Sequence, residues 1–379
     1  MFTSRRIATS GGGDKFRDEF SVAFDGTNDY VELGGAFNYN VHSISAWIKV
    51  NADTTSKAIF DYRDANNDGI YLAIDDVERI SYQINNADGL YTTPLTADVW
   101  YHIVATNDGS TSTIYLNGVS VETADTSSET VNIAGTYPPR IGARSHSSPN
   151  NYFNGNISEV AIYNSALTAN QVKTIYNGRE PYNHKEGVAS GNLKAWYRMG
   201  DGDLDRTTYT SNENNGLISN MAIPSSTAQT ANLITNGSFA GDLTGWTILN
   251  ASGDNNVTYS SGTARFLYDD AISTAALGLK QASVTTPGKT YKIIFTIAQA
   301  GGTSGTLKFY NGSTEEWVSL GSGAHTLYFI AQGTYIAFYR NVSNVDVDLT
   351  LDNVSMYEVT GTPGLLVNMT RDDYEGDTP

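Results

Sequence analysis

The carboxylates that could act as an acid–base pair lie in two short runs. Asp75, Asp76 and Glu78 form the first run, and Asp346 and Asp348 form the second. Two carboxylates can serve as acid and nucleophile only when they flank the same bond of a substrate. The first run precedes a predicted strand and is typical of a polar turn. Asp346 and Asp348 alternate on the face opposite the apolar residues of their strand, so we expect them to point into water.

Other signatures of catalysis are missing from the sequence. The 5 histidines show no metal-binding spacing such as H-E-x-x-H, and the chain contains neither a G-x-S-x-G elbow nor a P-loop. It has 0 cysteines, which excludes disulfides, thiolate catalysis and cysteine-type zinc sites. We therefore predict that the protein is not an enzyme.

One loop has the oxygen-rich spacing of a Ca²⁺ site. Asp64, Asn66 and Asp68 precede Gly69, and Asp75 stands twelve positions into the run, as in an EF-hand-like loop. Strands are predicted on both sides of this loop, where an EF-hand has helices. Segments rich in Asp and Asn also form hairpin turns through their own side chains. The sequence favours the turn and leaves a Ca²⁺ site open.

Charge and hydropathy exclude two classes of partner. The 379 residues carry a formal net charge of −17, with only 23 Lys and Arg. Phosphate binding needs clustered cations, so we expect no nucleic-acid partner. No stretch approaches the roughly 18 consecutive apolar residues of a membrane-spanning helix, so we expect no membrane insertion.

The elements that must position these residues are strands. Residues 43–50, 79–85 and 113–119 alternate apolar and polar side chains, and the third run ends on an Asn-Gly hairpin signal. One helix is predicted after Thr168, which can form a capping box with Gln171. Almost no other helical period is found, so the fold class is all-β.

Changes in composition divide the chain. Apolar alternation fills two long regions, whereas a Gly-rich head, a polar middle and an acidic end lack it. The predicted parts are an N-terminal arm at 1–18, a first β-domain at 19–180, a connector at 181–231 with one strand packing on the first domain, a second β-domain at 232–359, and a C-terminal tail at 360–379.

The first β-domain resembles a known family. The sequence reads FDGTNDYV at 24–31, SISAWIKV at 43–50, WYHIV at 100–104, IYLNG at 114–118 and FNGNISEVAIY at 153–163. This series is similar to the laminin-G-like (concanavalin A-like) jelly-roll domain. The connector motif WYRMGDG, at 196–202, is common in such domains and often found in phage proteins.

The second β-domain resembles the jelly-roll carbohydrate-binding modules of cellulases and xylanases. It opens with NLITNGSF at 232–239 and closes with LDNVSM at 351–356. In that family a structural Ca²⁺ is held partly by a carboxylate after the Phe and by the Asp of the last strand. Ala240 replaces the first of these here, whereas Asp352 fits the second. The resemblances together imply two antiparallel jelly-roll sandwiches. The second resemblance adds Asp352 as a candidate Ca²⁺ ligand, separate from the loop residues whose spacing suggests a site.

Both resemblances imply contact with glycans. Sugar binding needs flat aromatic faces and planar polar groups. Tyrosine also sits half-exposed on strands because it suits them, so a single tyrosine is weak support. The candidate residues are Arg144, His146, Asn150 and Tyr152 in the first domain, and Tyr268, Tyr310 and Trp317 in the second.

The N-terminal segment suggests where such a protein works. Residues 1–14, MFTSRRIATSGGGD, contain two arginines and no apolar core of a secretory signal. We therefore expect a non-enzymatic surface protein of a bacteriophage virion, made in the host cytoplasm and released by lysis. It would be a head decoration, a fibre or a tail appendage that binds host or environmental glycans. Its arm would contact other virion proteins.

Two alternatives stay open. One is a secreted bacterial lectin or adhesin, and the other is an accessory carbohydrate-binding part of a glycan-degrading enzyme. Most soluble oligomers are symmetric copies of one chain, so we also expect a homo-oligomer, for example a trimer.

Overall fold

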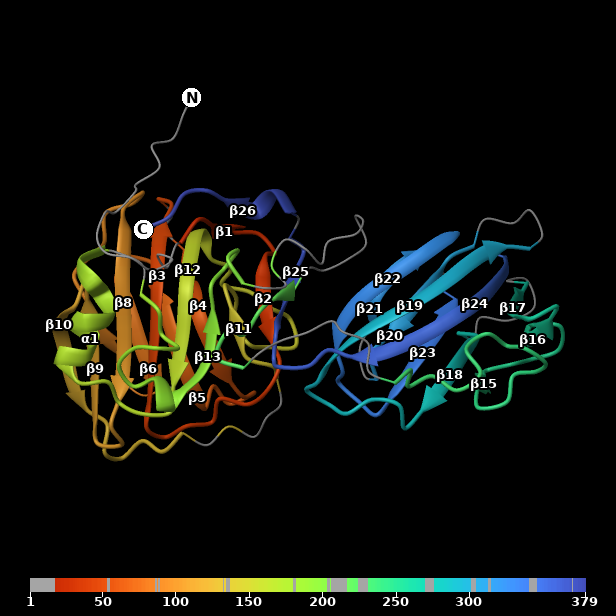
Figure 1. Cartoon of the computed structure of the whole chain (residues 1–379), viewed down its shortest axis with the longest axis horizontal. Coiled ribbons are helices and arrows are strands. Elements are labelled where there is room, and N and C mark those ends of the chain that lie inside the picture. The colour runs from red at the N-terminus through yellow and green to blue at the C-terminus, as the bar shows by residue number, and fades with distance from the viewer. Residues whose placement is uncertain are drawn as a thin grey trace, which may run out of the picture.

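The computed structural model describes most of the chain. The described residues are 18–52, 55–85, 87, 89–131, 133, 137–179, 182–202, 205, 217–223, 231–269, 276–300, 305–312, 315–340, 346–369 and 371–379, with 315–319 and 371 described in backbone only. They form two antiparallel β-sandwiches side by side (Figure 1). The predicted all-β fold of two sandwiches is confirmed. The predicted N-terminal arm, apart from Asp18, lies outside the described residues.

The first sandwich consists of sheets A and B. Sheet A has the order β10-β9-β8-β3-β12-β1-β26, and β13 also pairs with β12. Its strands are β1 (Ser21–Asp25), β3 (His42–Val50), β8 (Trp100–Asn107), β9 (Thr111–Leu116), β10 (Val119–Asp125), β12 (Asn154–Tyr163), β13 (Leu193–Tyr197) and β26 (Tyr374–Glu375).

Sheet B lies opposite sheet A and has the order β14-β25-β2-β11-β4-β5-β6-β7. Its strands are β2 (Tyr30–Leu33), β4 (Lys57–Arg63), β5 (Gly69–Ile74), β6 (Ile80–Ile84), β7 (Leu90–Tyr91), β11 (Arg140–Ile141), β14 (Leu217–Ile218) and β25 (Gly364–Val367).

The second sandwich consists of sheets C and D. Sheet C has the order β15-β18-β23-β20-β21, with β15 (Thr247–Leu249), β18 (Gly278–Ala282), β20 (Leu307–Tyr310), β21 (Glu315–Leu320) and β23 (Tyr335–Arg340). Sheet D has the order β16-β17-β24-β19-β22, with β16 (Asn256–Ser260), β17 (Thr263–Tyr268), β19 (Thr290–Gln299), β22 (Gly323–Ile330) and β24 (Val347–Glu358).

Residues 360–379 are part of the first sandwich and not a separate tail. After the second sandwich the chain returns, and β25 pairs with β2 while β26 pairs with β1 (Figure 1). Leu366 joins the core of the first sandwich, and Leu365 packs against the second. Two adjacent leucines bury opposite faces of one strand, which explains why this segment folds back.

The junction between the sandwiches is apolar. Leu217 and Leu365 of sheet B pack with Tyr328 and Ile330 of β22 and with Val359, and all five are buried. Burying such side chains stabilises the docked arrangement by about 1.5–3 kcal/mol for each large one. The second sandwich is therefore held against the end of sheet B, where β14 and β25 lie.

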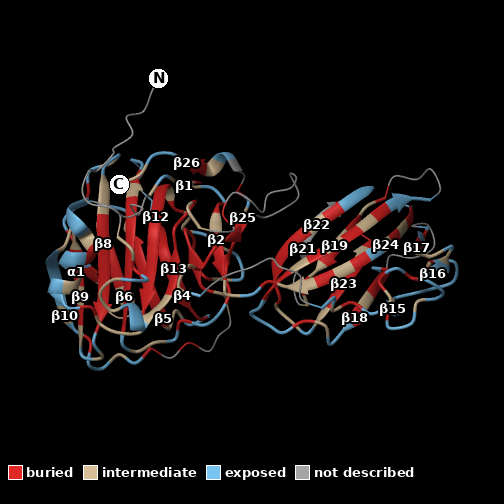
Figure 2. Ribbon diagram, in the orientation of Figure 1, coloured by how far each residue is buried: buried red, intermediate tan, exposed pale blue. Residues whose placement is uncertain are grey.

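Alternation along the strands places the two cores. In β6, Ile80, Tyr82 and Ile84 face the core between sheets A and B, whereas Ser81 and Gln83 point to the other face. Figure 2 shows burial running along most of both sheets of the first sandwich and alternating along the strands of the second. The predicted pattern at 79–85 is confirmed.

A short helix covers part of the outer face of sheet A. α1 (Ala169–Tyr176) begins after Thr168, whose side chain accepts a hydrogen bond from the backbone of Gln171, and the predicted capping box is present. Val172 and Ile175 of α1 pack with Trp196 in a separate apolar cluster. Three 3₁₀ turns complete the described helices: η1 (Asn177–Arg179), η2 (Ser190–Asn192) and η3 (Arg371–Asp373). In the described parts of the chain, no helix has the length and apolar character to cross a membrane.

Glu159 marks the point where β12 changes partner. Residues 154–157 of β12 pair with β1, and residues 160–163 pair with β13. Glu159 lies between these segments with a φ of 50° and is buried. Its carboxylate accepts hydrogen bonds from Trp196 Nε1 at 2.6 Å and Arg198 Nε at 3.0 Å. The connector motif thus supplies the partners of a buried carboxyl.

The free energy of unfolding should fall as Glu159 ionises. Burial raises the pKa of Glu159 from 4.5 to about 7, against the opposing effect of Arg198. Between about pH 4.5 and 7 the unfolded chain releases this proton first, so rising pH lowers the stability of the folded chain. We expect Glu159→Gln to flatten this part of a chemical-denaturation pH profile.

The matched control is Glu122→Gln, which removes an exposed carboxylate from β10 of the same sheet. It should leave the slope unchanged. Equal slopes for wild type and Glu159→Gln would contradict the assignment.

Candidate functional site

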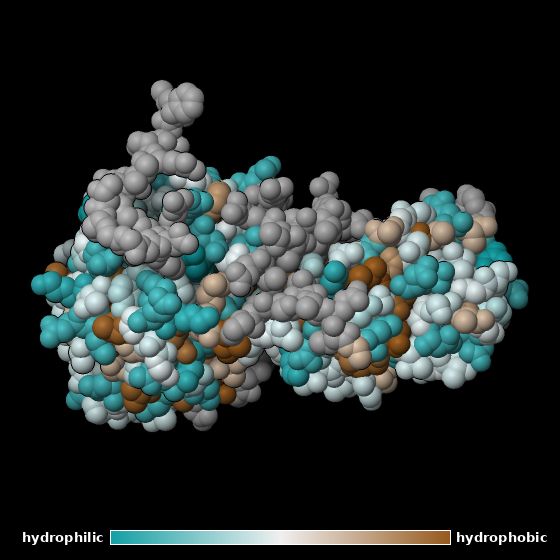
Figure 3. All heavy atoms as spheres, in the orientation of Figure 1, coloured by the Kyte–Doolittle hydropathy of each residue, from teal (hydrophilic) through white to brown (hydrophobic). Residues whose placement is uncertain are grey.

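Both outer faces of the first sandwich are partly covered. The connector and α1 cover part of sheet A, and the second sandwich covers the β14 end of sheet B. Hydrophilic and neutral residues cover most of the visible surface in Figure 3, with hydrophobic ones in separate patches. A hollow of about 230 Å³ lies on the outer face of sheet B, over β5, β6 and β7. This hollow is the candidate site.

One row of side chains crosses sheet B toward the hollow. Strand register places Glu32 opposite Arg140, Arg140 opposite Asp61, Asp61 opposite Tyr71 and Tyr71 opposite Gln83. Directly opposed residues share a face of an antiparallel pair, so the whole row points outward. Sheet geometry therefore connects a charged stretch on β2, β11 and β4 with the wall of the hollow.

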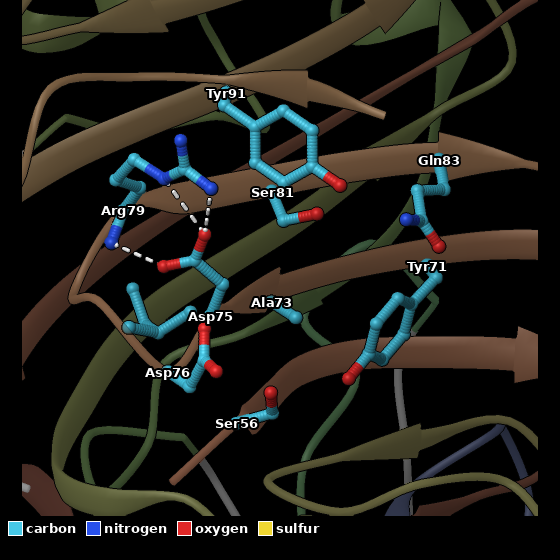
Figure 4. A pocket seen from close by; sticks show the side chains of 10 residues that line it. Ser56, Tyr71, Ala73, Asp75, Asp76, Arg79, Ser81, Gln83 and Tyr91 are labelled. Atoms are coloured by element: carbon cyan, nitrogen blue, oxygen red, sulfur yellow. Dashed lines mark hydrogen bonds and ion pairs between the residues drawn. The ribbon is translucent and has the colours of Figure 1, made fainter. Parts of the chain in front are cut away.

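A second row forms the floor of the hollow. Ala73 of β5 is opposite Ser81 of β6, and Ser81 is opposite Tyr91 of β7. Because Ala73 and Ser81 have small side chains, a space remains above them, and Tyr71 and Tyr91 border this space. Figure 4 shows the Tyr71 and Tyr91 rings beside this floor, with Gln83 on their side of the hollow. Tyr91 is 36 % exposed and Tyr71 only 8 % exposed, so Tyr91 offers the accessible ring and Tyr71 a fixed wall.

An ion pair stands at the other end of the hollow. Asp75 Oδ2 accepts hydrogen bonds from Arg79 Nε at 2.8 Å, and Arg79 Nη2 lies 2.7 Å away (Figure 4). Partial burial raises the pKa of Asp75, but the hydrogen bonds from the Arg79 and Val77 backbone and the Arg79 side chain hold it below the ordinary value. Asp75 is therefore ionised and committed to Arg79 at neutral pH.

The wall residue Tyr71 rests on a second ion pair. The Arg63 guanidinium lies 3.8 Å from the centre of the Tyr71 ring, and Arg63 Nη2 donates to Asp61 Oδ2 at 2.6 Å. Burial raises the pKa of Asp61, while the hydrogen bond and charge of Arg63 lower it. Tyr71 is also held by Asn151, whose side-chain amide donates to its hydroxyl at 3.3 Å. The ring is thus fixed from two sides.

The predicted loop residues Arg144 and Tyr152 do not line the hollow. Arg144 Nη2 donates to Asn67 Oδ1 at 2.5 Å, and the Tyr152 hydroxyl donates to the backbone of Pro149 at 2.9 Å. These contacts hold the loop between β11 and β12 in place. Asn151 of the same loop contacts the hydroxyl of Tyr71, which lines the hollow.

The other two loop candidates also lack a position in the hollow. The His146 ring lies 5.2 Å from the Tyr137 ring, and its Nδ1 is 3.3 Å from the backbone nitrogen of Ser148. Asn150 is exposed, and its backbone carbonyl accepts from Arg144 at 2.8 Å. Neither side chain is among the residues that line the hollow.

The candidates in the second sandwich fall into different environments. Tyr268 is 2 % exposed and packs in the core, so it cannot stack on a sugar; its position on β17 points inward between sheets C and D. Tyr310 is half-buried on sheet C, with its ring 4.9 Å from that of Tyr339. Trp317 lies on β21, where the structure describes only the backbone.

The candidate Ca²⁺ ligands do not come together. Asp64, Asn66 and Asp68 lie in the hairpin turn between β4 and β5, where Asp64 Oδ1 accepts from the backbone nitrogens of Asn66 at 2.8 Å and Asp68 at 3.0 Å. Asp75 follows the far end of β5, and Asp352 lies on β24 of the second sandwich. Across the described residues, no three His, Asp or Glu side chains are grouped closely enough to hold a metal ion.

The residues of the hollow were missed because they lie on strands. The predicted sugar-binding residues of the first domain lie in the loop between β11 and β12. The residues of the hollow come instead from three strands: Tyr71 from β5, Ser81 and Gln83 from β6, and Tyr91 from β7. A signal was present in the alternation at 79–85. Its apolar residues mark the core, so the residues between them must form an outer surface.

Residues 25–173 match the family model described as the concanavalin A-like lectin/glucanases superfamily. The matched range ends before the connector. It confirms the resemblance inferred for the first domain. No curated protein matches the chain in sequence.

Solved structures with some similarity come from three different settings. One is a predicted carbohydrate-binding protein of Bacteroides ovatus, with 19 % identity over 54 % of this chain and 56 % of that chain and a TM-score of 0.42. Another is the heptameric SAP-like pentraxin of Limulus polyphemus, with 17 % identity over 42 % of this chain and 82 % of that chain and a TM-score of 0.34. A third is the CBM40 module of the Ruminococcus gnavus IT-sialidase, with 14 % identity over 41 % of this chain and 96 % of that chain and a TM-score of 0.37. The match thus spans little more than half of the Bacteroides chain. At these identities no ligand is transferred to this protein.

The Asp61–Arg63 ion pair, which supports the wall residue Tyr71, should stabilise the folded protein. Arg63→Met leaves the Asp61 carboxyl buried without its main partner, which costs about 3–5 kcal/mol in comparable buried pairs. We expect the free energy of unfolding of the single variant, measured with urea, to fall by this amount. The double variant Asp61→Asn/Arg63→Met should recover a large part of it, and an equal loss in both variants would contradict the pairing.

Proposed function

We propose that the protein is a non-enzymatic glycan-binding protein and that its sugar site is the hollow on sheet B. The observation that carries the proposal is the pair of tyrosines, Tyr71 and Tyr91, beside a floor of Ala73 and Ser81. The lectin-like match of residues 25–173 supports the same conclusion.

The chemistry of the hollow suits a sugar. A pyranose has C–H faces that pack on aromatic rings and hydroxyls that need planar donors and acceptors. Tyr91 supplies the accessible ring, while the Gln83 amide can both donate and accept. Ser56 and Ser81 add hydroxyl groups at the edge and on the floor. The site can therefore recognise a sugar through stacking and neutral hydrogen bonds.

The same geometry argues against hydrolysis. A general acid needs a carboxyl with a raised pKa, whereas that of Asp75 is held below its ordinary value. Asp76 is the other carboxylate lining the hollow, and it is exposed in the turn between β5 and β6. The site thus lacks a suitable acid and is proposed to bind without cleaving.

Glycan binding can be tested with two substitutions in the hollow. Tyr91→Ala and Gln83→Ala should each weaken binding of glycans on an array by at least about tenfold, because each removes a direct contact. Isothermal titration with the strongest array ligand gives the magnitude.

The matched control is Tyr259→Ala. Tyr259 is a 43 % exposed tyrosine on β16 of the second sandwich, far along the chain from the hollow. It should bind like the wild type. A wild type that binds no glycan, or a Tyr91→Ala variant that binds as well as Tyr259→Ala, would contradict the proposed site.

The setting that we propose is the surface of a bacteriophage virion, as a head decoration, fibre or tail appendage. The phage-like connector motif at 196–202 supports this setting, and the charge of −17 suits an exposed particle surface. The N-terminal arm would bind other virion proteins, and the chain would assemble as a symmetric homo-oligomer such as a trimer.

Mass spectrometry of purified virions tests this setting. We expect the chain in a fixed ratio to the major capsid protein after density-gradient purification. Its presence only in the culture supernatant of cells without particles would favour the secreted lectin or adhesin.

A further inference from the structure

We infer that the hollow selects uncharged sugars and rejects sugars that carry a carboxylate or sulfate, with Asp76 as the residue that sets this preference. The inference rests on the proposed glycan site and adds the class of ligand. It follows from how the charged groups around the hollow are paired.

The cation that lines the hollow is already engaged. Arg79 gives its Nε and Nη2 to Asp75, and its guanidinium lies 4.5 Å from the centre of the Tyr91 ring. A sugar carboxylate is normally recognised by two parallel hydrogen bonds from one guanidinium. Arg79 donates Nε and Nη2, one edge of its guanidinium, to Asp75, and the two charges offset each other. An acidic ligand would therefore have to share the guanidinium with Asp75.

The cations behind the hollow are also paired with acids. Arg63 gives Nε and Nη2 to Asp61 and is covered by the Tyr71 ring. Lys57 is fully buried, with its ammonium 3.4 Å from Glu78 Oε1 and 3.1 Å from the backbone carbonyl of Thr55. Neither cation can reach an anion in the hollow without breaking its own ion pair.

Asp76 leaves the hollow with an unbalanced negative charge. Asp75 and Arg79 cancel each other, whereas Asp76 is exposed and has no hydrogen bond or ion pair with any residue in the described parts of the chain. Figure 4 shows its carboxylate between Asp75 and Ser56, with no interaction drawn to Arg79. An anionic sugar would meet this carboxylate with no cation to offset it, whereas a neutral sugar can use it as a hydrogen-bond acceptor.

The preference should be about tenfold. Two like charges several ångströms apart at a protein surface repel by an amount equivalent to roughly a tenfold change in affinity. The repulsion is screened by salt, so the ratio of neutral to acidic binding should shrink when the salt concentration rises from 0.15 to about 1 M. Because Asp75 stays ionised in mild acid, Arg79 stays occupied and the preference should persist at about pH 5.

The test is a glycan array that carries neutral glycans together with their sialylated, uronate and sulfated counterparts, such as lactose with α2,3-sialyllactose. Wild type should bind the neutral member of a pair about tenfold more strongly. Asp76→Lys should remove or reverse this ratio, and Asp76→Asn should give an intermediate value. Thermal unfolding of each variant establishes that it is folded.

Asp254→Lys is the matched control, because Asp254 is an exposed aspartate of the second sandwich and the substitution changes the net charge equally. It should keep the wild-type ratio. A similar change in Asp254→Lys and Asp76→Lys would assign the effect to the overall charge and overturn the role of Asp76. Equal binding of neutral and acidic glycans by wild type overturns the selectivity alone, whereas no binding to any glycan overturns the proposed function as well.

Discussion

The pairing of β25 with β2 is the constraint on which the arrangement of the molecule depends. It brings Leu365 opposite Glu32 at one end of sheet B, after the chain has completed a whole second sandwich. Leu365 and Leu366 then bury opposite faces of the same strand, one against β22 and one in the first core. Separating β25 from β2 would lose the strand pairing and the burial of the leucines together. The second sandwich is therefore fixed to the first where the chain leaves the first sandwich and where it returns.

This constraint also divides the outer face of sheet B. The end near β25 is covered by the second sandwich, while the end near β7 carries the hollow. Between them lie ion pairs, Glu32 with Arg140 and Asp61 with Arg63. Buried charges of this kind are tolerated only when each one has a partner. The middle of the face is therefore a paired, rigid support and not an open charged surface.

The ion pairs determine which groups of the hollow are available to a ligand. Arg63 fixes Tyr71 from below, and Arg79 is held by Asp75 beside Tyr91. The arginines thus position aromatic rings, and their charges are neutralised by the acids that position them. What is left for a ligand is an aromatic ring, an amide, hydroxyls and one carboxylate, which is a set suited to neutral polyols.

The sequence by itself determined the strands, the two cores and the helix cap, since alternation and capping depend on neighbours a few residues apart. It also excluded cysteine chemistry. It did not place Tyr268 in a core or return Leu365 to sheet B, because both depend on pairing between strands distant in the chain. The hollow likewise exists only because register sets Ala73 beside Ser81 and Tyr91. Strand register is a property of the assembled sheet, and it alone decided which side chains became a site.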